Sequence, residues 1–84
     1  MARVTYYVVQ PFIRDAEGDL VAGDAMEAPA SNAAKHRAAF AVAAGDFIGA
    51  IAFARTGDPQ FGDFDDAIIL GKYGETPESV AFLE

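Results

Sequence analysis

Residues 47–56 read Phe-Ile-Gly-Ala-Ile-Ala-Phe-Ala-Arg-Thr, and this stretch decides the fold. Ile51 and Phe53 alternate with alanines, so an extended strand here has one bulky face and one small face. Small side chains let another backbone approach closely. We therefore expect a helix to lie against the alanine side of this strand.

The residues before this strand supply that helix. Between Ala33 and Ala44, eight residues are alanine or valine, most of them alanine, the residue with the highest helix propensity. Ser31 suits the cap that starts a helix, and Gly45 suits the left-handed residue that ends one. A helical wheel places in one apolar arc the residues expected to face the sheet: Ala33, Ala34, Ala38, Phe40, Ala41, Val42 and Ala44. We predict an alanine-rich helix over about 31–44 on one sheet face.

The first strand is predicted over 3–14, which is rich in β-branched and aromatic residues. Both of its faces are apolar, with Tyr7 and Val9 on one of them. Pro11 cannot donate to a sheet ladder, which indicates an edge position or a bulge. Gly18 marks a hairpin turn, and residues 20–28 return as a weaker strand interrupted at 23–24.

The last third predicts a turn-rich loop over 57–66, a strand over 67–73 and a short C-terminal helix opened by Thr76, Pro77 and Glu78. The element order is then ββαββ(α). We expect a single α+β domain over 1–84, with a small four-stranded, mainly antiparallel sheet. The order suits either a β-grasp-like arrangement or a plain antiparallel sheet with one covering helix.

Composition excludes several classes of function. The chain of 84 residues has no cysteine, which removes disulfides, thiolate metal sites and cysteine nucleophiles. Its longest apolar run, 47–54, is far shorter than the roughly 18 residues of a membrane-spanning helix. The start of the sequence lacks the pattern of a secretory signal, so the cytoplasm is the expected location.

The net charge of −7 is unevenly placed. Residues 58–84 hold seven of the thirteen carboxylates and a single basic residue, Lys72. Phosphate backbones repel such a surface, so direct nucleic-acid binding is not expected, whereas a basic protein partner suits it.

Three segments resemble a family of short uncharacterised bacterial proteins. They are Tyr-Tyr-Val-Val-Gln-Pro-Phe at 6–12, Ala-Phe-Ala-Arg-Thr-Gly-Asp-Pro at 52–59 and Gly-Asp-Phe-Asp-Asp-Ala at 62–67. The resemblance covers most of the chain and implies a bacterial cytoplasmic protein. It implies no activity, cofactor or catalytic residue.

The aspartate-rich loop is the candidate for metal chemistry. Its carboxylates, among glycines, are the oxygen ligands that hard cations prefer: Asp58, Asp63, Asp65 and Asp66. The spacing matches no EF-hand, and turn capping by aspartates is the commoner explanation. We therefore predict no metal site and no cofactor, and keep this loop as the candidate should a cation bind.

Catalytic residues are sparse. His36, the sole histidine, falls on the polar side of the predicted helix, and Ser31 and Ser79 sit where helices begin. No serine-nucleophile, dinucleotide or phosphate-loop motif occurs. Arg37 or Arg55 could pair with a loop aspartate and fix the loop, or could extend into solvent. The sequence therefore favours a protein that is not an enzyme.

Counting sheet faces points to self-association. One main helix covers one face, and a short C-terminal helix can cover only part of the other, so a second copy is expected to cover the rest. The residues predicted to contact a partner are Tyr7, Val9, Phe61 and Phe64. The expected function is a self-associating protein-interaction module and homodimer. A cation-dependent protein using the 58–66 loop and an acidic mimic of nucleic acid are the alternatives.

Overall fold

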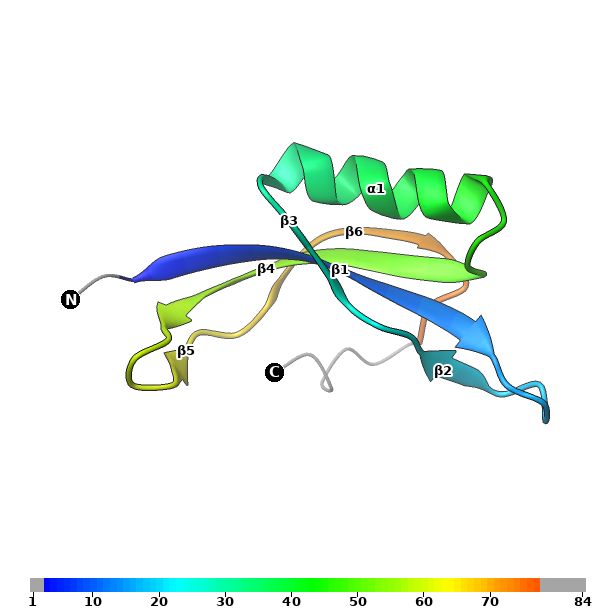
Figure 1. The fold of residues 1–84 in the computed structure, drawn as a ribbon, viewed down its shortest axis with the longest axis horizontal. Coiled ribbons are helices and arrows are strands. Elements are labelled where there is room, and N and C mark those ends of the chain that lie inside the picture. The colour runs from blue at the N-terminus through cyan, green and yellow to red at the C-terminus, as the bar shows by residue number, and fades with distance from the viewer. Residues whose placement is uncertain (1–2, 78–84) are drawn as a thin grey trace.

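The computed structural model describes residues 3–77, which form one sheet and one helix in an α+β arrangement (Figure 1). The elements are β1 (Val4–Arg14), β2 (Leu20–Ala22), β3 (Met26–Ala28), α1 (Ser31–Ala43), β4 (Gly49–Asp58), β5 (Asp63–Phe64) and β6 (Ile68–Gly74). The α+β class, the mainly antiparallel sheet and the single main helix are confirmed. The predicted C-terminal helix lies largely outside the described residues. No helix in the described range has the length and apolar character needed to cross a membrane.

The two long strands β1 and β4 form the centre of the sheet and pair antiparallel from Val4 opposite Gly57 to Phe12 opposite Gly49. Both β2 and β3 pair with β1 on its other side, and both β5 and β6 pair with β4. The sheet thus has four strand positions, and each outer position is divided between two strands. Every described pairing is antiparallel, which favours the plain antiparallel sheet, because a β-grasp contains a parallel central pair.

A bulge explains the proline in a central strand. Val9 lies opposite Met26 and Phe12 opposite Ala22, so residues 10–11 of β1 face three residues, 23–25, of the neighbouring chain segment. The backbone N–H of Gly23 donates to the Pro11 carbonyl at 2.9 Å. The Gln10 side-chain amide fills the gap and donates to the Gly23 carbonyl at 2.8 Å. Pro11 is therefore central, and the predicted bulge lies in the strand beside it.

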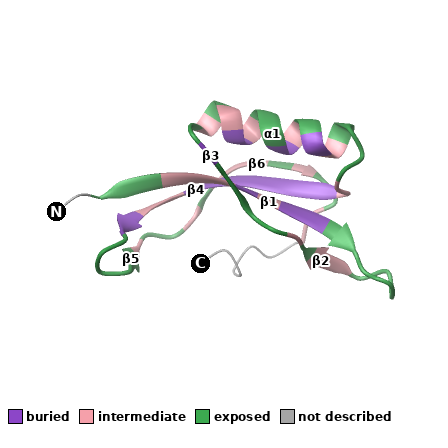
Figure 2. Cartoon of the chain, viewed as in Figure 1, coloured by how far each residue is buried: buried purple, intermediate pink, exposed green. Residues whose placement is uncertain are grey.

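The helix packs on the alanine side of β4, as predicted (Figure 2). Ala34 and Ala38 are fully buried against Ala50, Ala52 and Val9. Only part of the broad predicted arc faces the sheet, the part with Ala34, Ala38 and Ala41, and Phe40 at the edge of the arc is 72% exposed. That prediction for Phe40 is wrong.

The two ends of α1 differ in their capping. Gly45 takes a φ of 82°, and Asp46 N–H donates back to the Ala41 carbonyl at 3.0 Å, which together close the helix as predicted. At the start, Ala30 occupies the cap position without a side-chain hydrogen bond, and Ser31 is already helical. The prediction that Ser31 caps α1 is therefore wrong.

The face opposite α1 holds a second apolar cluster, made of Phe12, Ile51 and Phe53. Their exposures are 1%, 0% and 7%, with Val8, Leu20, Ala67 and Ile69 packed around them. The large side chains on this face are thus already buried within the chain. The expectation of a second copy rested on an uncovered sheet face, and this reason does not apply at these residues.

Candidate functional site

The aspartate-rich loop is organised by its own backbone. Asp58 is 8% exposed, and its carboxylate accepts the backbone N–H of Gln60 at 2.9 Å. Its carbonyl accepts the N–H of Gly62 at 2.9 Å, so this aspartate shapes the turn between β4 and β5. Within residues 3–77, no group of three or more histidine or acidic side chains is placed to hold a metal ion.

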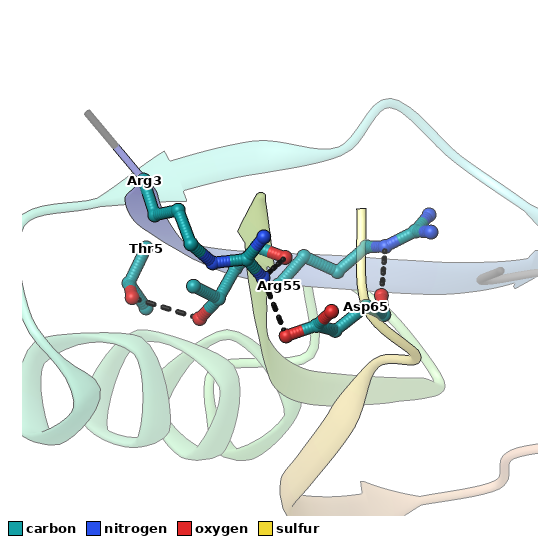
Figure 3. Close-up of polar contacts among 5 residues, drawn as sticks. Arg3, Thr5, Arg55 and Asp65 are labelled. Atoms are coloured by element: carbon teal, nitrogen blue, oxygen red, sulfur yellow. Dashed lines mark hydrogen bonds and ion pairs between the residues drawn. The ribbon is translucent and has the colours of Figure 1, made fainter. Parts of the chain in front are cut away.

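The remaining loop aspartates differ in their surroundings, and Asp63 lies opposite Asp58 in the β4–β5 pairing. Asp63 and Asp66 are exposed, and Asp65 forms an ion pair with Arg3, whose Nη2 lies 2.6 Å from its carboxylate (Figure 3). This pair was missed by the sequence reasoning. The pairing of Val4 with Gly57 brings Arg3 beside the loop. Because β1 and β4 are far apart in sequence, the register of their pairing could not be predicted from the sequence.

Arg55 fixes the loop in a different way from the one predicted. Its Nε donates to the backbone carbonyl of Asp65 at 3.3 Å, and its guanidinium lies 5.6 Å from the ring centroid of Phe64. Phe64 in turn contacts Tyr6, with ring centroids 6.1 Å apart. Next to this cluster, the hydroxyls of Thr5 and Thr56 share a hydrogen bond of 2.8 Å (Figure 3). Arg37 lies elsewhere and donates to the Glu27 carbonyl at 3.1 Å.

The four predicted partner contacts do not form one surface. Val9 is fully buried beneath α1, so its prediction as a contact residue is wrong. Tyr7 is half-buried against the same core, and Phe64 is half-buried beside Tyr6 and Arg55. Phe61 is 69% exposed and lines a shallow hollow of about 310 Å³ with Arg3, Asp58 and Asp63.

A more apolar hollow lies between α1 and β3. This groove, about 400 Å³, is lined by the side chains of Met26, Phe40, Ala41 and Phe47. Phe40 is the most exposed of the large apolar side chains in the described residues, and Met26 is 38% exposed. We call this surface the Phe40 groove. The helical wheel missed it because it assigned Phe40 to the buried side.

Charged side chains border the Phe40 groove. Arg37 lies one turn before Phe40, and one of its N–H groups is bonded to the Glu27 carbonyl of β3. Asp46 lies just beyond the end of α1, where its backbone hydrogen bond to Ala41 holds it. The groove therefore has an apolar floor, a cation towards one end and a carboxylate towards the other.

A third hollow, about 580 Å³, lies on the other side of α1. It is lined by polar side chains of the helix, Asn32, Lys35 and His36, and by Tyr73 of β6. His36 is exposed and borders both hollows. Its place on the polar side of the helix agrees with the sequence prediction.

Comparison with known proteins gives no further identification, because no family model, no curated protein and no solved structure matches the chain. The resemblance to short uncharacterised bacterial proteins stays a prediction.

Proposed function

We propose that this protein is a non-enzymatic, self-associating interaction module, in which the Phe40 groove is the surface that joins two copies. One observation carries the proposal: Phe40 projects from α1 with 72% of its surface exposed, next to a hollow lined by apolar side chains. Exposed aromatic side chains beside apolar pockets are the usual energetic centre of protein interfaces.

A second copy is the occupant that suits this surface best. A two-fold axis places the same patch on both sides of an interface, so a patch that holds both a projecting ring and a hollow is complementary to itself. The Phe40 groove has both features side by side. In such a dimer, each Phe40 enters the groove of the other copy beside Met26 and Phe47.

The alternatives have less support in the described residues. A cation-dependent function would need the loop aspartates to converge, whereas Asp58 caps a turn and Asp65 pairs with Arg3. An acidic mimic of nucleic acid would need a continuous strip of free carboxylates, and the Arg3–Asp65 pair interrupts one. The bacterial origin and the cytoplasmic location remain part of the proposal.

Sedimentation equilibrium over 1–200 µM protein would test the proposal, with Phe40→Ser as the variant and Phe61→Ser as its control. The two phenylalanines are almost equally exposed, at 72% and 69%, but lie on different surfaces. We expect a wild-type dimer that Phe40→Ser weakens by at least about thirtyfold, the effect of losing one interface hot spot. Phe61→Ser should leave the dimer unchanged. A wild-type protein that is monomeric throughout this range would refute the proposal.

A further inference from the structure

We infer that the two copies meet through antiparallel α1 helices, so that Arg37 of one copy pairs with Asp46 of the partner subunit across the Phe40 groove. This inference rests on the proposed self-association and adds the orientation of the copies and the ion pairs that set it.

The outer side of α1 is free to make this contact. The helix buries Ala34, Ala38 and Ala41 against the sheet, and it forms an outer layer of the described fold (Figures 1 and 2). Arg37, Phe40 and Ala44 follow one another at helical spacing along the side that borders the groove. Ala43 and Ala44 are exposed and small, which leaves room for a phenyl ring from a facing helix.

The charges decide the orientation. Arg37 precedes Phe40 by one turn, and Asp46 follows the helix end, so the two charges flank the ring along the chain. If the helices ran parallel about a two-fold axis, each charged residue would face the same residue of the other copy, so that cation met cation and carboxylate met carboxylate. An antiparallel arrangement centred near Phe40 and Ala41 instead sets each cation against a carboxylate.

Both charged groups are held in place and keep capacity for a partner. The Arg37 guanidinium uses Nη1 to bond the Glu27 carbonyl, and a guanidinium has five N–H donors in all. The remaining donors suit a carboxylate, which arginine binds through two parallel hydrogen bonds. Asp46 is positioned by its backbone bond to Ala41 and by the left-handed Gly45 before it. Neither group needs a large rearrangement to form the pair.

Charge reversal gives a sharp test. Each copy of the Arg37→Asp variant brings two carboxylates to the interface, at positions 37 and 46, and each copy of the Asp46→Arg variant brings two cations. We expect each variant alone to dimerise at least about tenfold more weakly than wild type, since like charges then face each other twice per dimer. An equimolar mixture of the two should form a heterodimer, and the double variant should recover the wild-type dimer. Lys72→Asp, with the same charge change on exposed β6, should have no effect.

Circular dichroism melts establish that each variant folds, and Arg37→Gln serves in place of Arg37→Asp if the reversal does not fold. Arg37→Gln keeps a donor for Glu27 and should weaken the dimer by a few-fold. A wild-type dimer that depends on Phe40 but is weakened by neither single charge reversal, or is weakened and not rescued in the double variant, overturns the antiparallel pairing and leaves the self-association standing. A monomeric wild type overturns both.

Discussion

Replacing Gly49 with alanine should destabilise the fold far more than its single added methyl group suggests. A Cβ atom at this position would lie 1.7 Å from the carbonyl oxygen of Glu75, about half of a normal contact distance. The obstructing atoms belong to backbone, so no side chain can turn aside. The chain at Glu75 must move away from β4, which breaks the hydrogen bond from Glu75 N–H to the Ile48 carbonyl, 2.9 Å long. The ion pair between Arg14 and Glu75 is then disturbed as well.

The size of the effect follows from these losses. Overpacking costs about 1–3 kcal/mol and the lost hydrogen bond about 1 kcal/mol, whereas the exposed ion pair adds little. The sum is about 2–4 kcal/mol, which for a domain of this size lowers Tm by roughly 10–25 °C. Thermal and urea unfolding monitored by circular dichroism would measure it. Gly23→Ala is the matched control, because its Cβ would meet nothing closer than 3.5 Å. A Gly49→Ala protein within about 0.5 kcal/mol of that control would refute the steric reasoning.

Three further substitutions probe the core and the loop. Ile51 is fully buried, whereas Ile68 is 64% exposed. In urea unfolding, Ile51→Ala should therefore lower the free energy of unfolding by about 2–5 kcal/mol, and Ile68→Ala by under about 1 kcal/mol. Equal losses would contradict the assigned burial. Arg55→Ala should lower the free energy of unfolding by about 1 kcal/mol, since the contacts of Arg55 with Asp65 and Phe64 are lost. It should also speed hydrogen exchange of the Asp65 amide, which donates to the Thr56 carbonyl at 2.8 Å. Unchanged exchange would show that Arg55 does not hold the loop.

The parts of the fold that depend on local pattern could be predicted from sequence. The alternation of Ile51 and Phe53 with alanines gave both the central strand and the face on which the helix packs. Gly45 and Gly18 marked the helix end and the hairpin turn, and each has the positive φ expected there. These signals are strong because the conformation of a few neighbouring residues determines them.

The candidate site was harder to predict because it depends on how distant segments meet. The wheel assigned Phe40 to the core because the apolar arc of the helix is broad, whereas only the part with Ala34, Ala38 and Ala41 is buried against the sheet. The partner of Asp65 was missed because Arg3 reaches the loop only through the long β1–β4 register. Val9 was predicted to contact a partner because its strand is apolar on both faces. The sequence does not show which of the two faces the helix covers.

The broken outer strands determine how this chain can assemble. β2 and β3 have three residues each and are separated by a bulge, β5 has only two residues, and the seven-residue β6 shifts register against β4 between Ala52 and Phe53. An uninterrupted outer strand exposes a row of backbone N–H and C=O groups on which further chains add without limit, the route to fibrils. Interruptions of this kind deny an incoming strand a continuous template. The proposed association through side chains on α1 would have a defined stoichiometry and would leave the sheet edges out of the contact.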